Sequence, residues 1–176
     1  MITPYFFLLV LQIAAVDEVN TVGIGVRAPE FTLPWATRDT ISFTGKSLSE
    51  MIGTSPVILA FYPADWSGGC TKEMCTLRDN FTTLKGLGAN VYGISGDYLF
   101  SHHEWAKHHQ LQFPLLSDHS HDIARRYQSF NEETGYNYRT VFVVDRSGIV
   151  RYVDRLYKVG TPDSFERLKE ALSELR

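Results

Sequence analysis

The two cysteines of the chain, Cys70 and Cys75, lie five residues apart within residues 63–78. A free cysteine with a pKa near 8.5 is only about 3% thiolate at neutral pH, so a nucleophilic thiol needs surroundings that favour its anion. Cys70 is expected in the first turn of a helix, where unpaired backbone N–H groups and the helix dipole favour a negative charge. The pattern therefore favours thiol chemistry at Cys70 over two buried, inert thiols.

The helix itself is predicted from apolar residues that follow Cys70 at intervals of three and four: Met74, Leu77, Phe81 and Leu84. On an ideal helix, the Cα atoms of Cys70 and Cys75 would be roughly 8.6 Å apart. A disulfide usually requires a Cα separation of about 4.4 to 6.8 Å. The two cysteines can therefore bond only after the first turn of the helix unwinds.

Three further residues could support a thiolate at Cys70. Ser67 lies three residues upstream and can turn its hydroxyl towards the same point, and Gly69 allows the backbone to come close. Arg139 precedes an apolar strand, so it would bring a cation to the carboxyl ends of neighbouring strands if the sheet is ordered as expected.

Composition places limits on the class of protein. The chain has 176 residues, of which 44% are hydrophobic and 13% aromatic, so it can bury a substantial core in one domain. The formal net charge is -3, and no basic run is interleaved with aromatic residues, which argues against nucleic-acid binding. Two close cysteines are also too few for a disulfide framework.

The order of predicted elements indicates the fold. Residues 57–62 are apolar without a break, as expected of a central strand covered on both faces. Other strands are predicted at 31–33, 40–43, 91–95 and 140–144, with 149–153 returning antiparallel, and helices at 47–51, after Cys70 as far as Gly86, at 101–109 and after Thr161. Capping boxes are expected at Ser47 with Glu50 and at Ser101 with Glu104. We expect residues 21–176 to form a single thioredoxin-like α/β domain, with three layers and a central mixed β-sheet that has helices on both faces.

The first twenty residues are expected to be an N-terminal apolar extension. Residues 5–16 form a run too short to span a membrane but about the length of the hydrophobic region of a signal peptide. No Lys or Arg precedes Arg27, which argues against a secretory signal. We expect a cytoplasmic protein, with export or membrane association through residues 1–16 as the alternative.

The residues around Cys70 resemble a known family. The pattern Pro63-x-x-x-Ser67-x-x-Cys70 is similar to the peroxiredoxin signature Pro-x-x-x-Thr/Ser-x-x-Cys. Matches of the same kind recur in order at residues 28–33, 61–63, 113–118 and 139–145. A second cysteine five residues after the first resembles the PrxQ subgroup of the AhpC/TSA superfamily, also called bacterioferritin comigratory protein. The chain departs from the subgroup at Ser67, usually Thr, and at Gly68, usually Pro, which predicts a more flexible loop.

The resemblance implies a thiol-dependent peroxidase that acts on hydrogen peroxide and organic hydroperoxides. Cys70 would be the peroxidatic cysteine and would become a sulfenic acid. Cys75 would be the resolving cysteine and would close an intramolecular disulfide, which a thioredoxin or a similar dithiol reductant would reduce. No metal or organic cofactor is expected, and the protein would be a monomer or a weak homodimer.

The resemblance also implies supporting roles. Ser67, Arg139 and the N–H groups of Gly69 and Cys70 would hold the peroxide and stabilise charge on the departing oxygen. Pro63 would shield the thiolate from water. Glu73 would orient Arg139, although a solvated acid in the first helical turn explains Glu73 equally well.

Two other functions are weighed against this hypothesis. A disulfide reductase of thioredoxin type would prefer Cys-x-x-Cys, which is closer than the spacing found here. A copper-binding thiol protein on this fold would prefer cysteines four apart on one helical face. Histidines could add metal ligands, but none forms an obvious metal motif, so solvated positions are expected for all six: His102, His103, His108, His109, His119 and His121.

Overall fold

Strand β3 (Val57–Phe61) lies inside a seven-stranded mixed sheet in the computed structural model, which describes residues 21–175. The strand order is β2-β1-β5-β4-β3-β8-β9, and β3 pairs parallel with β4 and antiparallel with β8. The other strands of the sheet are β1 (Thr32–Ala36), β2 (Ile41–Ser47), β4 (Asn90–Ser95), β5 (Leu115–Ser117), β8 (Thr140–Val144) and β9 (Val150–Asp154). The prediction that β3 is central and buried on both faces is confirmed.

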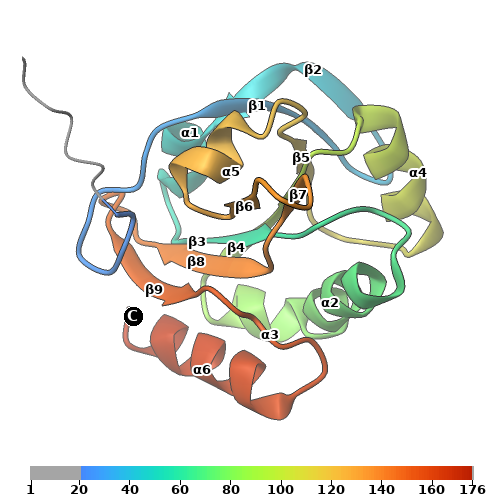
Figure 1. Cartoon of the computed structure of the whole chain (residues 1–176). Helices are drawn as coiled ribbons and strands as arrows, with labels where there is room; N and C mark the ends of the chain where they lie inside the picture. Colours follow the sequence, from blue (N-terminus) through green and yellow to red (C-terminus); the bar gives the residue numbers. More distant parts are fainter. Residues whose placement is uncertain (1–20, 176) are drawn as a thin grey trace, which may run out of the picture.

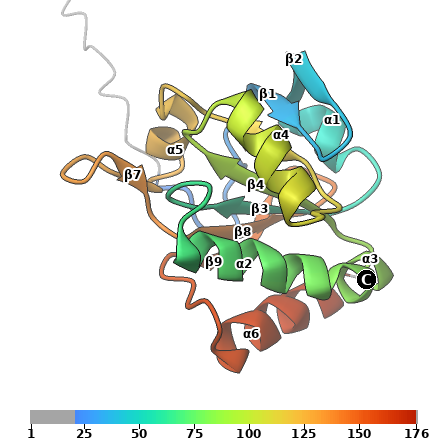
Figure 2. The same ribbon diagram turned by 90° about the vertical axis from the view of Figure 1, so that its right-hand side faces the viewer.

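Helices cover both faces of the sheet, as Figures 1 and 2 show. Alternate side chains of β3 enter two separate cores: Ile58 and Ala60 on one face, and Val57, Leu59 and Phe61 on the other. The first face packs against α2 (Gly68–Asp79), α4 (Leu99–His108) and α6 (Pro162–Ser173), and the second against α1 (Leu48–Ile52) and α5 (Asp122–Arg126). The predicted three-layer, thioredoxin-like α/β architecture is therefore confirmed.

Helix α2 ends earlier than its apolar stripe predicts. It stops at Asp79, and a separate short helix, α3 (Phe81–Gly86), follows after Asn80. Asn80 leaves the helical backbone region at φ -102° and ψ 11°, and its side-chain amide donates to the carbonyl of Thr76 at 2.9 Å. This local bond competes with helix continuation, so the prediction of one helix running as far as Gly86 is wrong.

The two predicted capping boxes have opposite outcomes. Ser47 accepts from the backbone N–H of Glu50, and the Glu50 carboxylate accepts from the backbone N–H of Ser47, so the first box is confirmed. Helix α4 instead begins at Leu99, and Ser101 lies inside it. The second box is wrong because the Ser101 hydroxyl donates elsewhere, to the carboxylate of Asp65 at 2.8 Å.

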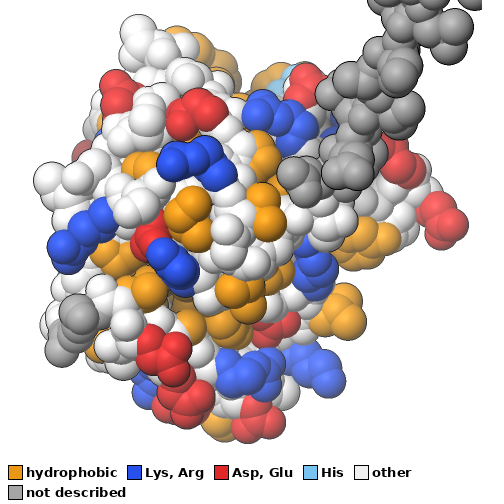
Figure 3. Space-filling view, turned by 90° about the vertical axis from the view of Figure 1, so that its left-hand side faces the viewer, with side chains coloured by type: hydrophobic (Ala, Val, Ile, Leu, Met, Phe, Trp, Pro, Cys, Tyr) orange, Lys and Arg blue, Asp and Glu red, His pale blue; other side chains and the backbone are white. Residues whose placement is uncertain are grey.

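The loop between α5 and β8 holds a small hairpin of β6 (Phe130–Asn131) and β7 (Tyr136–Asn137), separate from the main sheet. Within residues 21–175, no helix has the length and apolar character needed to cross a membrane. The apolar run predicted at residues 5–16 lies outside the described residues. On the face of the molecule in Figure 3, basic and acidic side chains are interspersed with hydrophobic ones, so no single sign of charge dominates it.

A tight contact beneath α2 yields a stability prediction at Gly93 in β4. A methyl group there would lie 2.7 Å from Leu115 Cδ2 and 3.3 Å from Met74 Sδ. We expect Gly93→Ala to lower the free energy of unfolding by about 1–3 kcal/mol, because overpacking displaces core side chains. Urea denaturation measures this change.

Gly53→Ala is the matched control. The nearest atoms to a methyl group there are carbonyl oxygens at 3.9 Å, and the backbone is already helical at φ -49°. Equal unfolding free energies for Gly93→Ala and Gly53→Ala would contradict the proposed overpacking.

Candidate active site

Cys70 lies in the first turn of α2 with its side chain fully buried. Ser67 is the N-cap residue: its hydroxyl oxygen accepts from the Cys70 N–H at 3.4 Å, and the hydroxyl donates to the carbonyl of Ala64 at 3.2 Å. The Ser67 hydroxyl therefore caps the start of α2, and its proton is donated to the Ala64 carbonyl. This differs from the expectation that it turns towards the cysteine sulfur.

Strand pairing brings Arg139 to the end of β3. Thr140 is the register partner of Phe61, so Arg139 enters β8 beside the loop that leads to Cys70. Its guanidinium donates from Nη1 to Glu73 Oε2 at 2.6 Å and also interacts with the Cys70 sulfur. Its backbone carbonyl accepts from the Tyr157 N–H at 3.0 Å, which fixes the main chain from the opposite side.

Gly69 permits the close approach of this guanidinium to the start of α2. A methyl group at Gly69 would lie 2.6 Å from Arg139 Nη2, so any larger residue would displace the arginine. Gly68 is different, because a methyl group there would meet nothing within 4 Å. Pro63 is partly buried and lies in the loop between β3 and α2, two residues after the strand ends.

Glu73 is wholly buried, and its Oε1 has no hydrogen-bond partner. Burial raises the pKa of Glu73 to about 7, although the hydrogen bond and charge of Arg139 act in the opposite direction. Burial also opposes the charge of Arg139, but the Glu73 carboxylate and the Cys70 sulfur outweigh it and raise the pKa of Arg139. The buried carboxylate of Glu73 is incompletely solvated, so its ion pair with Arg139 does not restore the usual low pKa.

Cys75 lies in the middle of α2, partly exposed and not bonded to Cys70. Both thiols are free while the helix is wound. The sulfur of Cys75 faces α4, where it lies 3.9 Å from His109 Nδ1. The structure thus separates the two cysteines, and Cys75 has a contact that the sequence did not predict.

A buried polar network under the loop was missed by sequence reasoning. The Asp65 carboxylate accepts from the hydroxyls of Tyr62 and Ser101, both at 2.8 Å, and from His102 Nδ1 at 2.9 Å. The other ring nitrogen of His102 faces the Leu116 carbonyl at 3.3 Å. Burial and the Asp65 carboxylate raise the pKa of Tyr62 well above its usual value, which keeps its hydroxyl available as a donor.

His102 is therefore not solvated, and that prediction is wrong for this residue. The signal was present in the spacing of Leu99, His102 and Trp105, which recur at intervals of three and form one buried face of α4. The backbone of Asp65 is fixed as well, because its N–H donates to Asp97 Oδ2 at 2.8 Å. The loop before Cys70 is thus hydrogen-bonded to the segment that follows β4 and to α4.

The remaining histidines are partly or fully exposed, and among residues 21–175 no three His, Cys, Asp or Glu side chains gather as a metal site would require. His108 and His109 lie beside Trp66, with ring centroids 5.7 and 6.4 Å from it. Trp66 is half-exposed, and its Nε1 donates to the Ser101 hydroxyl at 3.1 Å. It therefore covers the side of the loop that faces α4.

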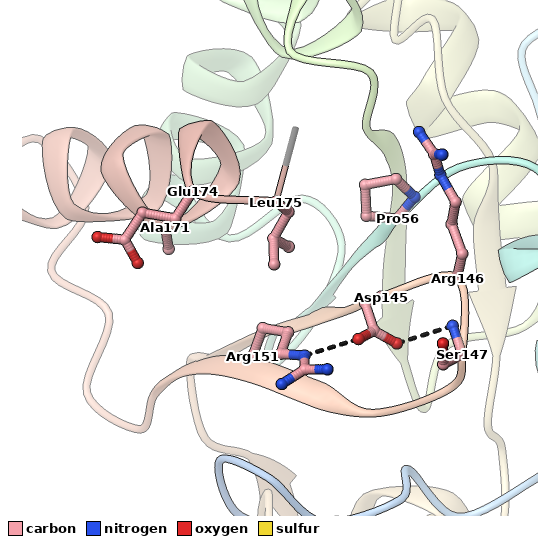
Figure 4. A pocket seen from close by; sticks show the side chains of 8 residues that line it. All are labelled: Pro56, Asp145, Arg146, Ser147, Arg151, Ala171, Glu174 and Leu175. Carbon is pink, nitrogen blue, oxygen red and sulfur yellow. Dashed lines mark hydrogen bonds and ion pairs between the residues drawn. The ribbon is translucent and has the colours of Figure 1, made fainter.

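A surface hollow lies at the opposite end of the sheet (Figure 4). Pro56 and Leu175 line it together with Asp145 and Arg151, which form an ion pair at 2.6 Å. Pro56 precedes β3, whereas Cys70 follows that strand, so the length of β3 separates the hollow from the cysteines.

Comparison with known proteins identifies similar chains. The sequence profile of the AhpC/TSA family matches residues 24–153. A chloroplastic peroxiredoxin Q of Oryza sativa subsp. japonica is 40% identical over 136 residues, which are 75% of this chain and 58% of that protein. A relative in Coxiella burnetii, named as a peroxiredoxin bcp, is 34% identical over 139 residues, 76% of this chain and 88% of that one.

Among solved structures, the peroxidoxin BcpB of Mycobacterium tuberculosis matches with a TM-score of 0.77 and 28% identity. The match covers 87% of this chain and 97% of that one. The chain spans less than two thirds of the length of the rice relative, whose remaining residues have no counterpart in the match.

The buried carboxyl of Glu73 leads to a pH prediction. Its pKa is about 7 in the folded chain against 4.5 when exposed, so the folded state binds the extra proton between these values. The contribution of Glu73 to the free energy of unfolding should be greatest below pH 4.5. It should be lost as the pH rises through 7, by on the order of 3 kcal/mol in total. Glu73→Gln should remove this decrease while keeping an acceptor for Arg139.

Chemical denaturation at a series of pH values between 4.5 and 8 measures the effect. Glu170→Gln, an exposed change on α6, is the control and should keep the wild-type slope. A Glu73→Gln variant with the wild-type slope would contradict the raised pKa of Glu73.

Proposed function

Because this chain belongs to the AhpC/TSA family, we propose that it is a thiol-dependent peroxidase that reduces hydrogen peroxide and organic hydroperoxides through Cys70. The observation that carries the proposal is the position of Cys70, in the first turn of α2 and beside an arginine held by a buried glutamate. The names of similar proteins in rice, Coxiella and Mycobacterium support the same activity.

In the first step, the Cys70 thiolate attacks one peroxide oxygen and breaks the O–O bond. Cys70 becomes a sulfenic acid, and the other oxygen leaves as hydroxide or alkoxide and takes up a proton. The Arg139 guanidinium and the free N–H groups at the start of α2 stabilise the negative charge that moves from sulfur to the departing oxygen.

Access to the sulfur requires a small displacement. The exposed fraction of Cys70 is 0%, and Arg139 lies beside it with 25% of its own side chain exposed. A shift of the guanidinium or of the loop that begins at Pro63 would open a path for a molecule as small as a peroxide. Pro63, in the same loop, limits the entry of water to the thiolate.

In the second step, Cys75 condenses with the sulfenic acid and releases water, which leaves a disulfide within one chain. The wound helix opposes this reaction, because residues five apart on α2 point in different directions. The first turn must therefore unwind before the sulfurs meet. A thioredoxin or another dithiol protein then reduces the disulfide and allows α2 to wind again.

The central experiment follows oxidation by hydrogen peroxide in a stopped-flow instrument, with wild type, Cys70→Ser and Cys75→Ser. We expect a rapid reaction in wild type, none in Cys70→Ser, and a sulfenic acid that accumulates and reacts with dimedone in Cys75→Ser. Mass spectrometry of the wild type should show a disulfide between the two cysteines. Rapid peroxide consumption by Cys70→Ser would refute the proposal.

The proposed unwinding can be tested at Gly68. This residue is the first of α2, where proline is well tolerated, and the preceding Ser67 is already extended at ψ 140°. Gly68→Pro should raise the free energy of unfolding by about 0.5–1 kcal/mol. It should slow disulfide formation by about 2- to 5-fold, since the wound turn is favoured, without slowing sulfenic acid formation.

Gly68→Ala is the control and should give a smaller change in the same direction, because alanine restricts the backbone less than proline. A Gly68→Pro protein that is more stable but closes the disulfide at the wild-type rate would show that this turn does not open in the second step.

A further inference from the structure

The contact between Cys75 and His109 joins two helices at the point where the second step begins. Cys75 lies on α2 and His109 is the C-cap residue of α4, and the sulfur is 3.9 Å from His109 Nδ1. This is within the range of a thiol hydrogen bond to a ring nitrogen. The contact exists while both cysteines are free.

Cys75 needs a proton acceptor if it is to act as a nucleophile. Burial raises the pKa of Cys75, the nearby Arg78 opposes this, and Asp79 adds to it. An unshifted thiol is only about 3% thiolate at neutral pH, and a raised pKa reduces that fraction further. Without a proton acceptor, the rate of the resolving reaction would be limited by the small thiolate fraction of Cys75.

His109 is suited to accept that proton. Partial burial, the neighbouring His108 and the Arg78 guanidinium all lower the pKa of His109 below its usual value near 6.5. The imidazole is thus neutral at pH 7, and a tautomer with the proton on Nε2 leaves a lone pair on Nδ1 towards Cys75.

The position of His109 does not depend on the first turn of α2. Arg78, in the last turn, donates to the His109 carbonyl at 2.7 Å, and the neighbouring Leu77 is fully buried. The imidazole also packs edge-to-face against Trp105, with ring centroids 5.8 Å apart. When the first turn unwinds, Cys75 and His109 can therefore stay together while Cys70 moves towards them.

We propose that His109 is the general base of the resolving step, an inference that rests on the proposed peroxidase function. As the Cys75 sulfur attacks the Cys70 sulfur, the S–S bond forms and the S–O bond of the sulfenic acid breaks. The Cys75 proton passes to His109 Nδ1 and then to the departing hydroxide, which leaves as water. The peroxide has already supplied the oxidising equivalents, so no other oxidant is required.

The test separates the two phases of oxidation in the full chain. Sulfenic acid formation depends on peroxide concentration, whereas disulfide formation does not, and dimedone trapping with mass spectrometry identifies each product. His109→Asn keeps an oxygen acceptor near the Nδ1 position but cannot take the proton at neutral pH. We expect the second phase to slow at least ten-fold at pH 7, a lower bound set beneath the roughly 10²- to 10⁴-fold that is typical of general-base catalysis, with the first phase changed less than about two-fold.

The pH profile distinguishes a base from a structural residue. In wild type, the second-phase rate should fall at acidic pH, below the lowered pKa of His109, where the imidazole is protonated, and should level off above it. In His109→Asn, the rate should rise about ten-fold per pH unit and approach the wild-type rate only at alkaline pH, where the Cys75 thiolate forms unaided. His108→Asn, an exposed change beside it, should keep the wild-type second-phase rate at pH 7 and move only the acid limb, towards higher pH, because His108 lowers the pKa of His109.

Each other result overturns a defined part of the proposal. Wild-type second-phase rates in His109→Asn, or a slowing by one factor at every pH, would refute a general base at His109 while leaving the peroxidase intact. His109→Gln, checked for folding by circular dichroism, repeats the measurement with a second side chain. If wild type forms no disulfide between Cys70 and Cys75, both the resolving step and the role of His109 are refuted.

Discussion

The ion pair of Arg139 and Glu73 is the interaction on which the arrangement around Cys70 depends. It joins the entry of β8 to the second turn of α2, across 66 residues of sequence, with a 2.6 Å bond. Glu73 is fully buried, so without the Arg139 guanidinium its carboxyl would be protonated and would no longer hold a cation at this position. Because Glu73 is part of α2, the helix must be folded for Glu73 to hold the Arg139 guanidinium beside the Cys70 sulfur. Gly69 completes the arrangement, because its lack of a side chain lets the guanidinium lie against the helix start.

Much of the fold could be predicted because its signals are local. An uninterrupted apolar run identified β3, the Ser47–Glu50 pair identified the start of α1, and α6 begins directly after Thr161 as expected. The similar proteins confirm the resemblance to peroxiredoxins that the cysteine loop suggested. The break at Asn80 could not be predicted, since the apolar stripe continues through it and only the amide bond to Thr76 reveals it.

The parts of the site that sequence reasoning missed depend on distant partners. His102 is 37 residues from Asp65, and His109 is 34 residues from Cys75. Six histidines within twenty residues all look alike in sequence, and only packing makes one a buried donor and another a neighbour of a thiol. Arg139 was proposed from its place before an apolar strand, from the assumed strand order and above all from the resemblance to peroxiredoxins, and strand pairing places it beside the loop that leads to Cys70.

The buried Asp65 network has a consequence for the energetics of the whole redox cycle. It fixes the chain just before Cys70 to α4 and to the segment after β4, while Leu77 is buried near the end of α2, which the break at Asn80 marks. The chain between these two fixed points is short, so in the proposed cycle only a few residues lose and regain their helical backbone conformation at each turnover. The entropy gained on opening is correspondingly limited, and the sheet never has to take part. In the oxidised protein, a reductant would then bind a short loop with few accessible conformations, fixed at one end by the Asp65 network and at the other by the remaining part of α2.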